Sequence, residues 1–477
     1  MKSIPLIGLC FVTGMLGLQQ CLATNGMNLE SYGPVAMGMG GTAIASDATT
    51  AAVMNNPATL SLQEADHQLN IALGVLGPDV SAVSPDSQTA NSSADAFFMP
   101  ALGYVAKHGD LHYGIAVFGQ GGMGTRYSSQ SFLSAGSGKK VESCVSVGRV
   151  MIPVAYKLNK QLTIAATVDF VWAGMSIDMP MSSSQFADLV TPGMQNSGQA
   201  SGTLLNSMMP LMMAGYQLDW ADFSFNSGTQ FMGEATGYGY AGKVGLLYEV
   251  NPALKIGFVY QTQTVLSDLE SSDATMSFQM SNDSPPQGYP SVFPASVTGD
   301  IKIVDFEWPS LYGVGINYRF NNKFSASIDV KSVQWSDVME DFTMNFVVNQ
   351  DAANDMSSMG GPNMQGQEIT ASLYQYWDDQ VIVMVGGEYE VDDTYTVRFG
   401  YNYAENPIPD RYLNPLFPAT VESHITAGFS AKLSDRSRFD FGASMALEKE
   451  VSIPTPMGSL KSTHRQFNGQ IMYTYFW

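Results

Sequence analysis

Basic side chains in segments of alternating polarity are the residues of this sequence best placed to bind a charged group. Arg398 and Lys331 fall on the polar face of two such segments, and Arg126 lies in a glycine-rich stretch. An arginine or lysine shielded from water pairs with a carboxylate. That carboxylate can belong to a ligand or to the chain itself, as in a pair between Lys331 and Asp329. The residues alone leave both interpretations open.

Nucleophilic and metal-assisted catalysis have little support in the sequence. None of the histidines accompanies a recognisable serine or cysteine nucleophile motif. Acidic pairs such as Asp378 and Asp379 lack the ligand spacing of a metal site. We therefore expect no enzyme activity, no metal and no cofactor. The histidines considered are His67, His108, His112, His424 and His464.

The composition indicates a surface that does not meet water alone. Charged residues make up 14% of the chain, against about 25% in ordinary soluble domains. The formal net charge is −21. Because nucleic-acid sites need basic patches, this charge argues against a nucleic acid as partner.

The first 23 residues are typical of a secretory signal peptide. Lys2 is followed by an uncharged apolar stretch, residues 4–18, and by Cys21-Leu22-Ala23. The apolar stretch is too short for a membrane-spanning helix, and small residues precede the expected cleavage after Ala23. A lipoprotein signal with Cys21 as the lipidated residue is the alternative, but no small residues precede that cysteine.

Period-two alternation is the dominant signal in the rest of the chain. Near the C-terminal end, Phe467, Ile471 and Tyr473 fall on one face, and Asn468 and Gln470 fall on the other. Such alternation predicts strands with one apolar face. We expect about fourteen strands, near residues 66–77, 96–107, 110–120, 143–158, 161–177, 238–250, 253–268, 304–319, 322–340, 379–391, 394–404, 421–433, 436–449 and 463–477.

Short and long connections alternate between these strands. Turns such as His108-Gly109 contrast with long segments such as 178–237. This is the plan of a bacterial outer-membrane barrel, and because backbone groups in hydrocarbon must be paired, the sheet must close. We therefore expect an all-β protein of the Gram-negative outer membrane. Residues 66–477 would form a transmembrane antiparallel β-barrel in contact with lipid and lipopolysaccharide. A soluble secreted all-β protein is the alternative.

Residues 24–65 precede the first strand and do not alternate. Small residues and a turn around Pro57 make a compact segment that can pack inside a polar lumen, so we expect a plug. A phosphate loop at Gly38 to Gly41 is disfavoured because no lysine follows. A disordered periplasmic tail is the other alternative.

Four motifs in order along the chain resemble the FadL-type outer-membrane transport family. The stretch from Tyr32 to Ala58 resembles the N-terminal hatch of that family, with its Asn-Pro-Ala sequence. Residues 245–260, 329–336 and 398–409 resemble its central hairpin, its strand ending in Trp-Ser, and a late strand with its loop. The resemblance implies a barrel, which we expect to be monomeric. Its hatch residues would include Gly38, Gly40, Gly41, Asn56, Pro57 and Ala58.

The resemblance also implies passive uptake of a hydrophobic small molecule, and long-chain fatty acids are our main expectation. The anion partners would then be Arg398, Lys331 and Arg126. By our alignment, fatty-acid-binding members carry an arginine where this chain has residues 172–175, Trp-Ala-Gly-Met. That departure leaves an aromatic or other neutral hydrocarbon as the alternative. A general porin for polar solutes is a second alternative, but it would need no hatch.

The long segment 178–237 contains the apolar residues that we expect to capture such a ligand outside the cell. Soluble proteins avoid exposing large apolar patches, and methionine-rich surfaces adapt to ligands of different shapes. The alternative is that these side chains only pack the loop on itself. The residues are Leu204, Leu205, Met208, Met209, Leu211, Met212, Met213, Trp220 and Phe223.

Overall fold

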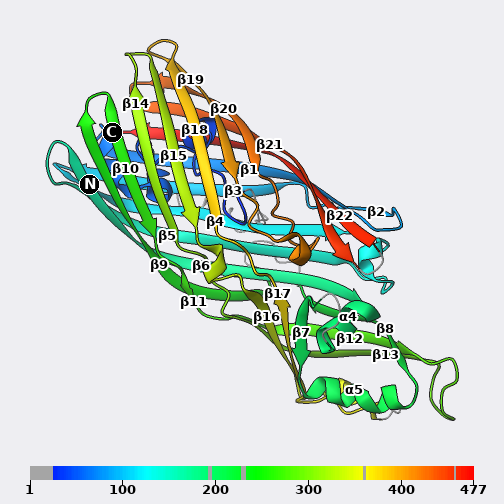
Figure 1. The fold of residues 1–477 in the computed structure, drawn as a ribbon. Helices are drawn as coiled ribbons and strands as arrows, with labels where there is room; N and C mark the ends of the chain where they lie inside the picture. Colours follow the sequence, from blue (N-terminus) through cyan, green and yellow to red (C-terminus); the bar gives the residue numbers. More distant parts are fainter. Residues whose placement is uncertain (1–24, 192–195, 227–232, 358–360, 456–457) are drawn as a thin grey trace.

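The chain forms one continuous antiparallel sheet whose wall closes into a barrel, as Figure 1 shows. The computed structural model describes residues 25–191, 196–226, 233–357, 361–455 and 458–477, so the expected signal peptide, residues 1–23, lies outside the described part. Each wall strand pairs with the next one, and β22 pairs with β1 to complete the circuit. The wall strands are β1 (His67–Val83), β3 (Phe97–His108), β4 (Leu111–Tyr127), β5 (Val141–Lys157), β6 (Leu162–Ser182), β9 (Ala235–Asn251), β10 (Leu254–Gln261), β14 (Leu311–Arg319), β15 (Phe324–Val333), β18 (Gln380–Glu390), β19 (Tyr395–Ala404), β20 (Ser423–Ser434), β21 (Ser437–Thr455) and β22 (Gly458–Phe476).

Every segment that we expected in the wall takes part in this circuit, and the sheet also contains strands that we did not expect. It contains 22 strands in the described ranges. Segments that we expected to be long loops also alternate between buried and exposed residues, for example from Val292 to Val304. The additional strands are β2 (Thr89–Asn91), β7 (Gly198–Ser201), β8 (Gln217–Phe225), β11 (Val265–Leu266), β12 (Leu269–Ser281), β13 (Val292–Val304), β16 (Asp341–Val348) and β17 (Glu368–Tyr374).

Most of the additional strands form an extension beyond the wall, at the end opposite the short turns (Figure 1). β6 pairs with β9 as far as Met175, and from Ile177 it pairs with β8 instead. The sheet then continues through β12, β13, β16 and β17 to β7. The helices α4 (Ser183–Val190) and α5 (Thr203–Met213) pack on this extension through buried residues such as Leu189 and Leu204. The other short helices are α2 (Pro34–Gly38), α3 (Ala52–Asn55), η1 (Pro57–Leu62), η2 (Phe132–Ser134), η3 (Trp335–Asp337), η4 (Ala352–Asn354) and η6 (Asp410–Tyr412).

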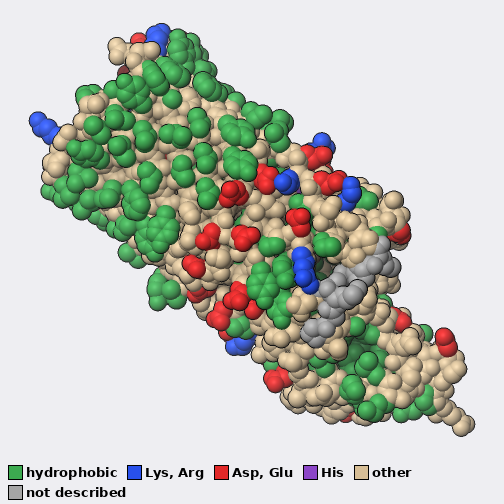
Figure 2. Space-filling model, viewed as in Figure 1, with side chains coloured by type: hydrophobic (Ala, Val, Ile, Leu, Met, Phe, Trp, Pro, Cys, Tyr) green, Lys and Arg blue, Asp and Glu red, His purple; other side chains and the backbone are tan. Residues whose placement is uncertain are grey.

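The outer face of the wall carries a broad apolar belt, visible in the upper part of Figure 2. Outward side chains there are strongly exposed: Val168 is 70% exposed and Tyr240 is 64% exposed. A surface of this extent is unfavourable in water, so it faces lipid. Between the belt and the extension, Figure 2 shows charged side chains, and pairs such as Arg465 with Asp79 at 2.6 Å lie on the outer strands. No helix in the described ranges is long and apolar enough to cross a bilayer.

Residues 25–66 lie against the inner face of the wall and bond to strands all around it. The Asp329 carboxylate on β15 accepts the backbone N–H groups of Ala43 and Ile44 at 2.7 and 2.9 Å. On β21, Ser444 donates to the Glu30 carboxylate at 2.6 Å. Because a closed barrel has polar inward side chains, it supplies partners for the many free backbone groups of this irregular segment.

Inward-facing glycines allow this segment to approach the wall closely. A Cβ atom on Gly245 would overlap the Asn56 side chain, and one on Gly257 would overlap the carbonyl oxygen of Ile44. Much of the glycine content of the strands is therefore explained by the contact between backbones, since any larger residue would displace the segment.

We predict that Asp329→Ala loosens residues 25–66 inside the wall. The variant removes two hydrogen bonds to a charged acceptor, each contributing about 2 kcal/mol. The steady ion conductance of the purified protein in planar bilayers should rise, while the barrel still shifts its electrophoretic mobility on heating. Asp329→Asn, which keeps one acceptor oxygen, should conduct much less than the alanine variant. Equal conductance of Asp329→Ala and the unmodified protein would contradict the prediction.

Candidate functional site

An apolar groove opens where the ends of β6, β21 and β22 that lie farthest from the short turns meet α4, β17 and η6. Its volume is about 530 Å³, within the range of small-molecule sites. The lining is mostly aliphatic and thioether side chains, which favours apolar contacts over hydrogen bonding. Among them are Met179, Met181, Leu189, Leu373, Leu413 and Leu416.

Aromatic side chains border this groove on the outer side. The rings of Tyr374 and Tyr376 lie 5.5 Å apart, and those of Tyr376 and Tyr412 lie 5.1 Å apart. Desolvation and the neighbouring Tyr374 hydroxyl raise the pKa of Tyr376 above its ordinary value. Arg411 lies over the Tyr412 ring at 5.7 Å and is the only charged residue among the described residues that line the groove.

A smaller cavity of about 30 Å³ lies deeper and shares Leu373, Gln375 and Asn414 with the groove. Its remaining lining consists of Met, Val and Phe side chains, including Met27 of the N-terminal segment. None of the described residues that line it is charged. The two cavities are therefore adjacent, and their mostly apolar lining extends from the groove to Met27 of the N-terminal segment.

The wall is incompletely paired next to this segment. β3 pairs with β4 only between Leu102↔Val117 and the short turn at His108↔Leu111. Residues 97–101 of β3 and 118–127 of β4 do not pair with each other. The free edge of β4 pairs instead with the N-terminal segment: Gly122 N–H donates to the Met27 carbonyl at 3.0 Å. A further cavity of about 30 Å³ lies at this place, lined by both strands and by Leu29 and Tyr32.

The predicted capture residues do not form one surface. Leu204, Met208, Leu211 and Phe223 are buried, and Leu205 and Trp220 are half-buried. Met209, Met212 and Met213 are exposed on α5, Met213 at 81%. None of these nine residues lines the groove.

The groove was missed because its lining comes from segments far apart in the chain. The sequence signal that could have indicated one part is Leu413-Asn414-Pro415-Leu416, an apolar stretch within an otherwise polar long loop.

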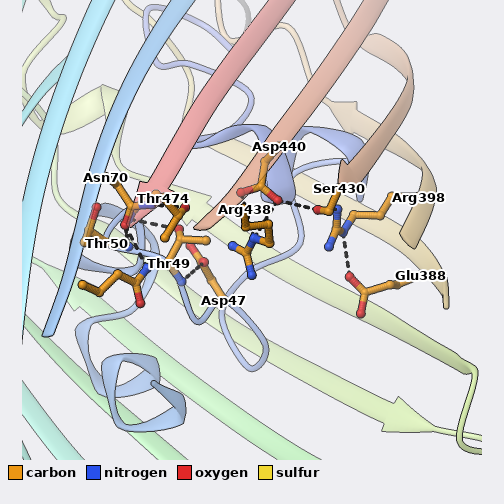
Figure 3. Close-up of polar contacts among 12 residues, drawn as sticks. Asp47, Thr49, Thr50, Asn70, Glu388, Arg398, Ser430, Arg438, Asp440 and Thr474 are labelled. Carbon is orange, nitrogen blue, oxygen red and sulfur yellow. Dashed lines mark hydrogen bonds and ion pairs between the residues drawn. The ribbon is translucent and has the colours of Figure 1, made fainter. Parts of the chain in front are cut away.

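The three candidate anion partners lie away from the groove and the deeper cavity. Arg398 is buried and paired with Glu388 at 2.6 Å, and it also donates to Ser430 (Figure 3). Arg126 is paired with Glu142 at 2.5 Å. Lys331 is buried on the inner face of β15, two residues from Asp329. The pairs of Arg398 and Arg126 correspond to the structural interpretation that the sequence left open.

The six hatch candidates all lie in the segment that contacts the inner wall. Gly40 N–H donates to Thr426 at 2.9 Å, and the backbone of Gly38 lies against Gly428. Gly41 follows with φ +91°. The Asn56 amide donates to the carbonyl oxygens of Ile44 and Leu246 at 2.7 and 3.0 Å, and Asn56 caps the helix that starts at Pro57 and Ala58. In Figure 3, Thr50 and Asn70 show the same type of contact on β1, at 3.0 Å.

Fold, lipid-facing belt and apolar cavities together define an outer-membrane transport barrel for hydrophobic compounds. The chain belongs to the family described as outer membrane protein transport protein (OMPP1/FadL/TodX), whose sequence pattern matches residues 19–471. It is accordingly a protein of the Gram-negative outer membrane. Family and structural neighbours are transport channels rather than enzymes, and no group of three or more metal-ligating side chains occurs in the described ranges.

Solved structures of the same fold cover nearly the whole chain. The toluene transporter TodX of Pseudomonas putida is 27% identical with a TM-score of 0.78, over 94% of this chain and 99% of that one. The toluene transporter TbuX of Ralstonia pickettii is 29% identical with a TM-score of 0.73, over the same shares of both chains. A FadL homologue of Pseudomonas aeruginosa is 11% identical, covers 96% of this chain and 99% of that one, and has a TM-score of 0.61, so it supports the fold alone.

A protein of Chlorobium limicola is also similar over a short stretch. It is described as an uncharacterized protein in the phosphoenolpyruvate carboxykinase gene 5′ region and is 42% identical over 89 residues. These residues are 18% of this chain and 42% of that relative, so the chain matches less than half of its length.

We predict that Leu373→Asp weakens binding of an apolar fluorescent dye to the purified protein by about tenfold or more. Leu373 lines both the groove and the deeper cavity, and placing a carboxylate among apolar side chains costs several kcal/mol. Met213→Ser, on the exposed face of α5, should leave the dye affinity unchanged. The opposite ranking of the two variants would show that α5 and not the groove binds the dye.

Proposed function

We propose that this protein is a passive outer-membrane uptake channel for small neutral aromatic hydrocarbons. The observation that carries the proposal is the mostly apolar lining of the groove and of the deeper cavity, where Arg411 is the only charged side chain among the described lining residues. Methionine and phenylalanine side chains bind aromatic rings through dispersion and sulfur–ring contacts. The similarity to TodX and TbuX, both described as toluene transporters, supports the same class of ligand.

Long-chain fatty acids, our main expectation from the sequence, are the second candidate. The carboxylate of a fatty acid needs a cation or several hydrogen-bond donors when it leaves water. Arg398 and Arg126 are already paired with carboxylates of the chain. Arg411 is the charged residue among the described residues that line the groove, so it is the side chain that would contact the carboxylate of a fatty acid whose alkyl chain lies in the groove.

Residues 24–65 act as the hatch in this proposal. Their described part bonds to strands on different sides of the lumen, namely β1, β6, β9, β15, β20 and β21. Such a segment would prevent steady flow of ions, which separates this function from that of a general porin.

The ligand leaves sideways, between β3 and β4, in this proposal. Both strands lack their mutual hydrogen bonds there. The cavity between them is lined by Leu29, two residues along the chain from Met27, which lines the deeper cavity. A lateral exit releases an apolar molecule into lipid without a passage through water, which hydrophobic transfer favours.

Uptake by cells tests the proposed ligand. In a Gram-negative host without its own proteins of this family, expression should raise the initial uptake of radiolabelled toluene at least severalfold, and that of laurate little. Arg411→Ala should leave toluene uptake unchanged. Laurate uptake that exceeds toluene uptake and is lost in Arg411→Ala would establish the fatty-acid function instead.

A variant that displaces residues 27–28 from the edge of β4 tests whether these residues close the proposed exit between β3 and β4. A Cβ atom on Gly121 would overlap the Met27 carbonyl oxygen, so Gly121→Ala should move residues 27–28 away from β4 and raise the ion conductance in planar bilayers. Gly469→Ala is the matched control, because the nearest atom to its new Cβ is 3.9 Å away. Conductance that does not distinguish the two variants would refute the role of residues 27–28.

A further inference from the structure

The separation of β4 from β3 coincides with one extra residue in β4. Gly119 pairs with Gly148 and Gly121 pairs with Val147, so Gln120 has no partner on β5 and forms a β-bulge. A bulge bends its strand and shifts which residues face inward. Inward residues of β4 have even numbers as far as Phe118 and odd numbers from Gly121, as their partners on β5 show.

Arg149 on β5 forms a hydrogen bond with the side chain of this extra residue, Gln120. Its guanidinium donates from Nε to the Gln120 side-chain oxygen, from NH1 to Asp169 at 2.9 Å and from NH2 to Thr264 at 3.0 Å. Both Arg149 and Asp169 have side chains with no exposed surface. The rigid fork of an arginine can hold three partners in fixed directions, which a lysine cannot.

The backbone of Gln120 is bound by the N-terminal segment. The Tyr32 hydroxyl of the N-terminal segment donates to the Gln120 carbonyl oxygen at 2.6 Å. Two residues further along, Gly122 donates to Met27. Gln120 thus connects the wall, through Arg149, to the segment that fills the gap between β3 and β4.

We propose that Arg149 is a positioning residue for the lateral exit. It fixes the bulge at Gln120, which keeps the edge of β4 turned away from β3 and free to bind residues 27–32. The inference rests on the proposed exit route, but it concerns the group that maintains the gap. It requires no contact of Arg149 with the ligand, since Arg149 lines neither the groove nor the deeper cavity.

The test breaks the contact without leaving a buried charge unpaired. Gln120→Leu removes the acceptor and keeps the Arg149–Asp169 pair, whereas Gln120→Glu restores the contact as an ion pair. We expect Gln120→Leu to lower the maximal toluene uptake rate about fivefold or more, with the dye affinity of the groove unchanged. Gln120→Glu should recover most of the rate. The double variant Arg149→Met, Asp169→Leu should behave as Gln120→Leu does.

Amide hydrogen exchange provides a readout that does not depend on the transported compound. In Gln120→Leu, peptides that contain residues 27–33 and 118–124 should exchange at least tenfold faster, and peptides from β14 and β15 should not change. Unchanged exchange would overturn the proposal even if the uptake rate falls. Should the unmodified protein take up neither toluene nor laurate, the proposed function fails. Faster exchange of these peptides in Gln120→Leu would even then establish that the contact between Arg149 and Gln120 fixes the bulge. A uniform increase along the chain would indicate a general loss of stability and overturn the positioning role.

Discussion

Backbone hydrogen bonding in a medium without water is the constraint on which this structure depends. Each wall strand in the described ranges has a neighbour on both sides, from β1 through to the pairing of β22 with β1. β4 departs from this pattern beyond Val117, where it no longer pairs with β3 and instead binds residues 27–28 of the N-terminal segment. The place where the wall is weakest is therefore the place where the N-terminal segment supplies the missing partner.

The inner and outer faces of the wall answer two different requirements. Outward residues such as Val168 and Phe399 are large and apolar because they meet hydrocarbon. Inward residues are small or polar because they must satisfy an irregular backbone at close range, as Asp329 and Gly257 do. A single alternating pattern thus encodes both the membrane-spanning outer surface and the inner surface that binds the N-terminal segment.

The extension places the apolar groove outside the part of the barrel that spans the membrane. Strands β6, β21 and β22 continue beyond the apolar belt and carry the groove outside it, past the charged pairs on the outer surface. A ligand in the groove is consequently sheltered by Leu189, Leu373 and Leu416 before it reaches the lumen. The parts of these strands that extend past the apolar belt are not required to span the membrane, but they hold the groove outside it.

The sequence alone determined the class of the fold, the place of the wall strands and the distinct character of residues 24–65. These features depend on local patterns: period-two alternation, short turns and a run of small residues. It also indicated the family, through motifs such as Asn56-Pro57-Ala58. It did not indicate the strands beyond the wall, because alternation in β12, β13, β16 and β17 lies in segments whose length suggested loops.

Only the tertiary structure decided where the site is and which charges are engaged. The groove assembles residues from Leu133 to Leu460, and no local pattern reports contacts between such distant segments. Arg398 has the same sequence character whether it binds a ligand or Glu388, and the neighbouring strand β18 decides between these. The bulge at Gln120 is equally invisible, because a bulge is defined by the partner strand and not by the residue that forms it.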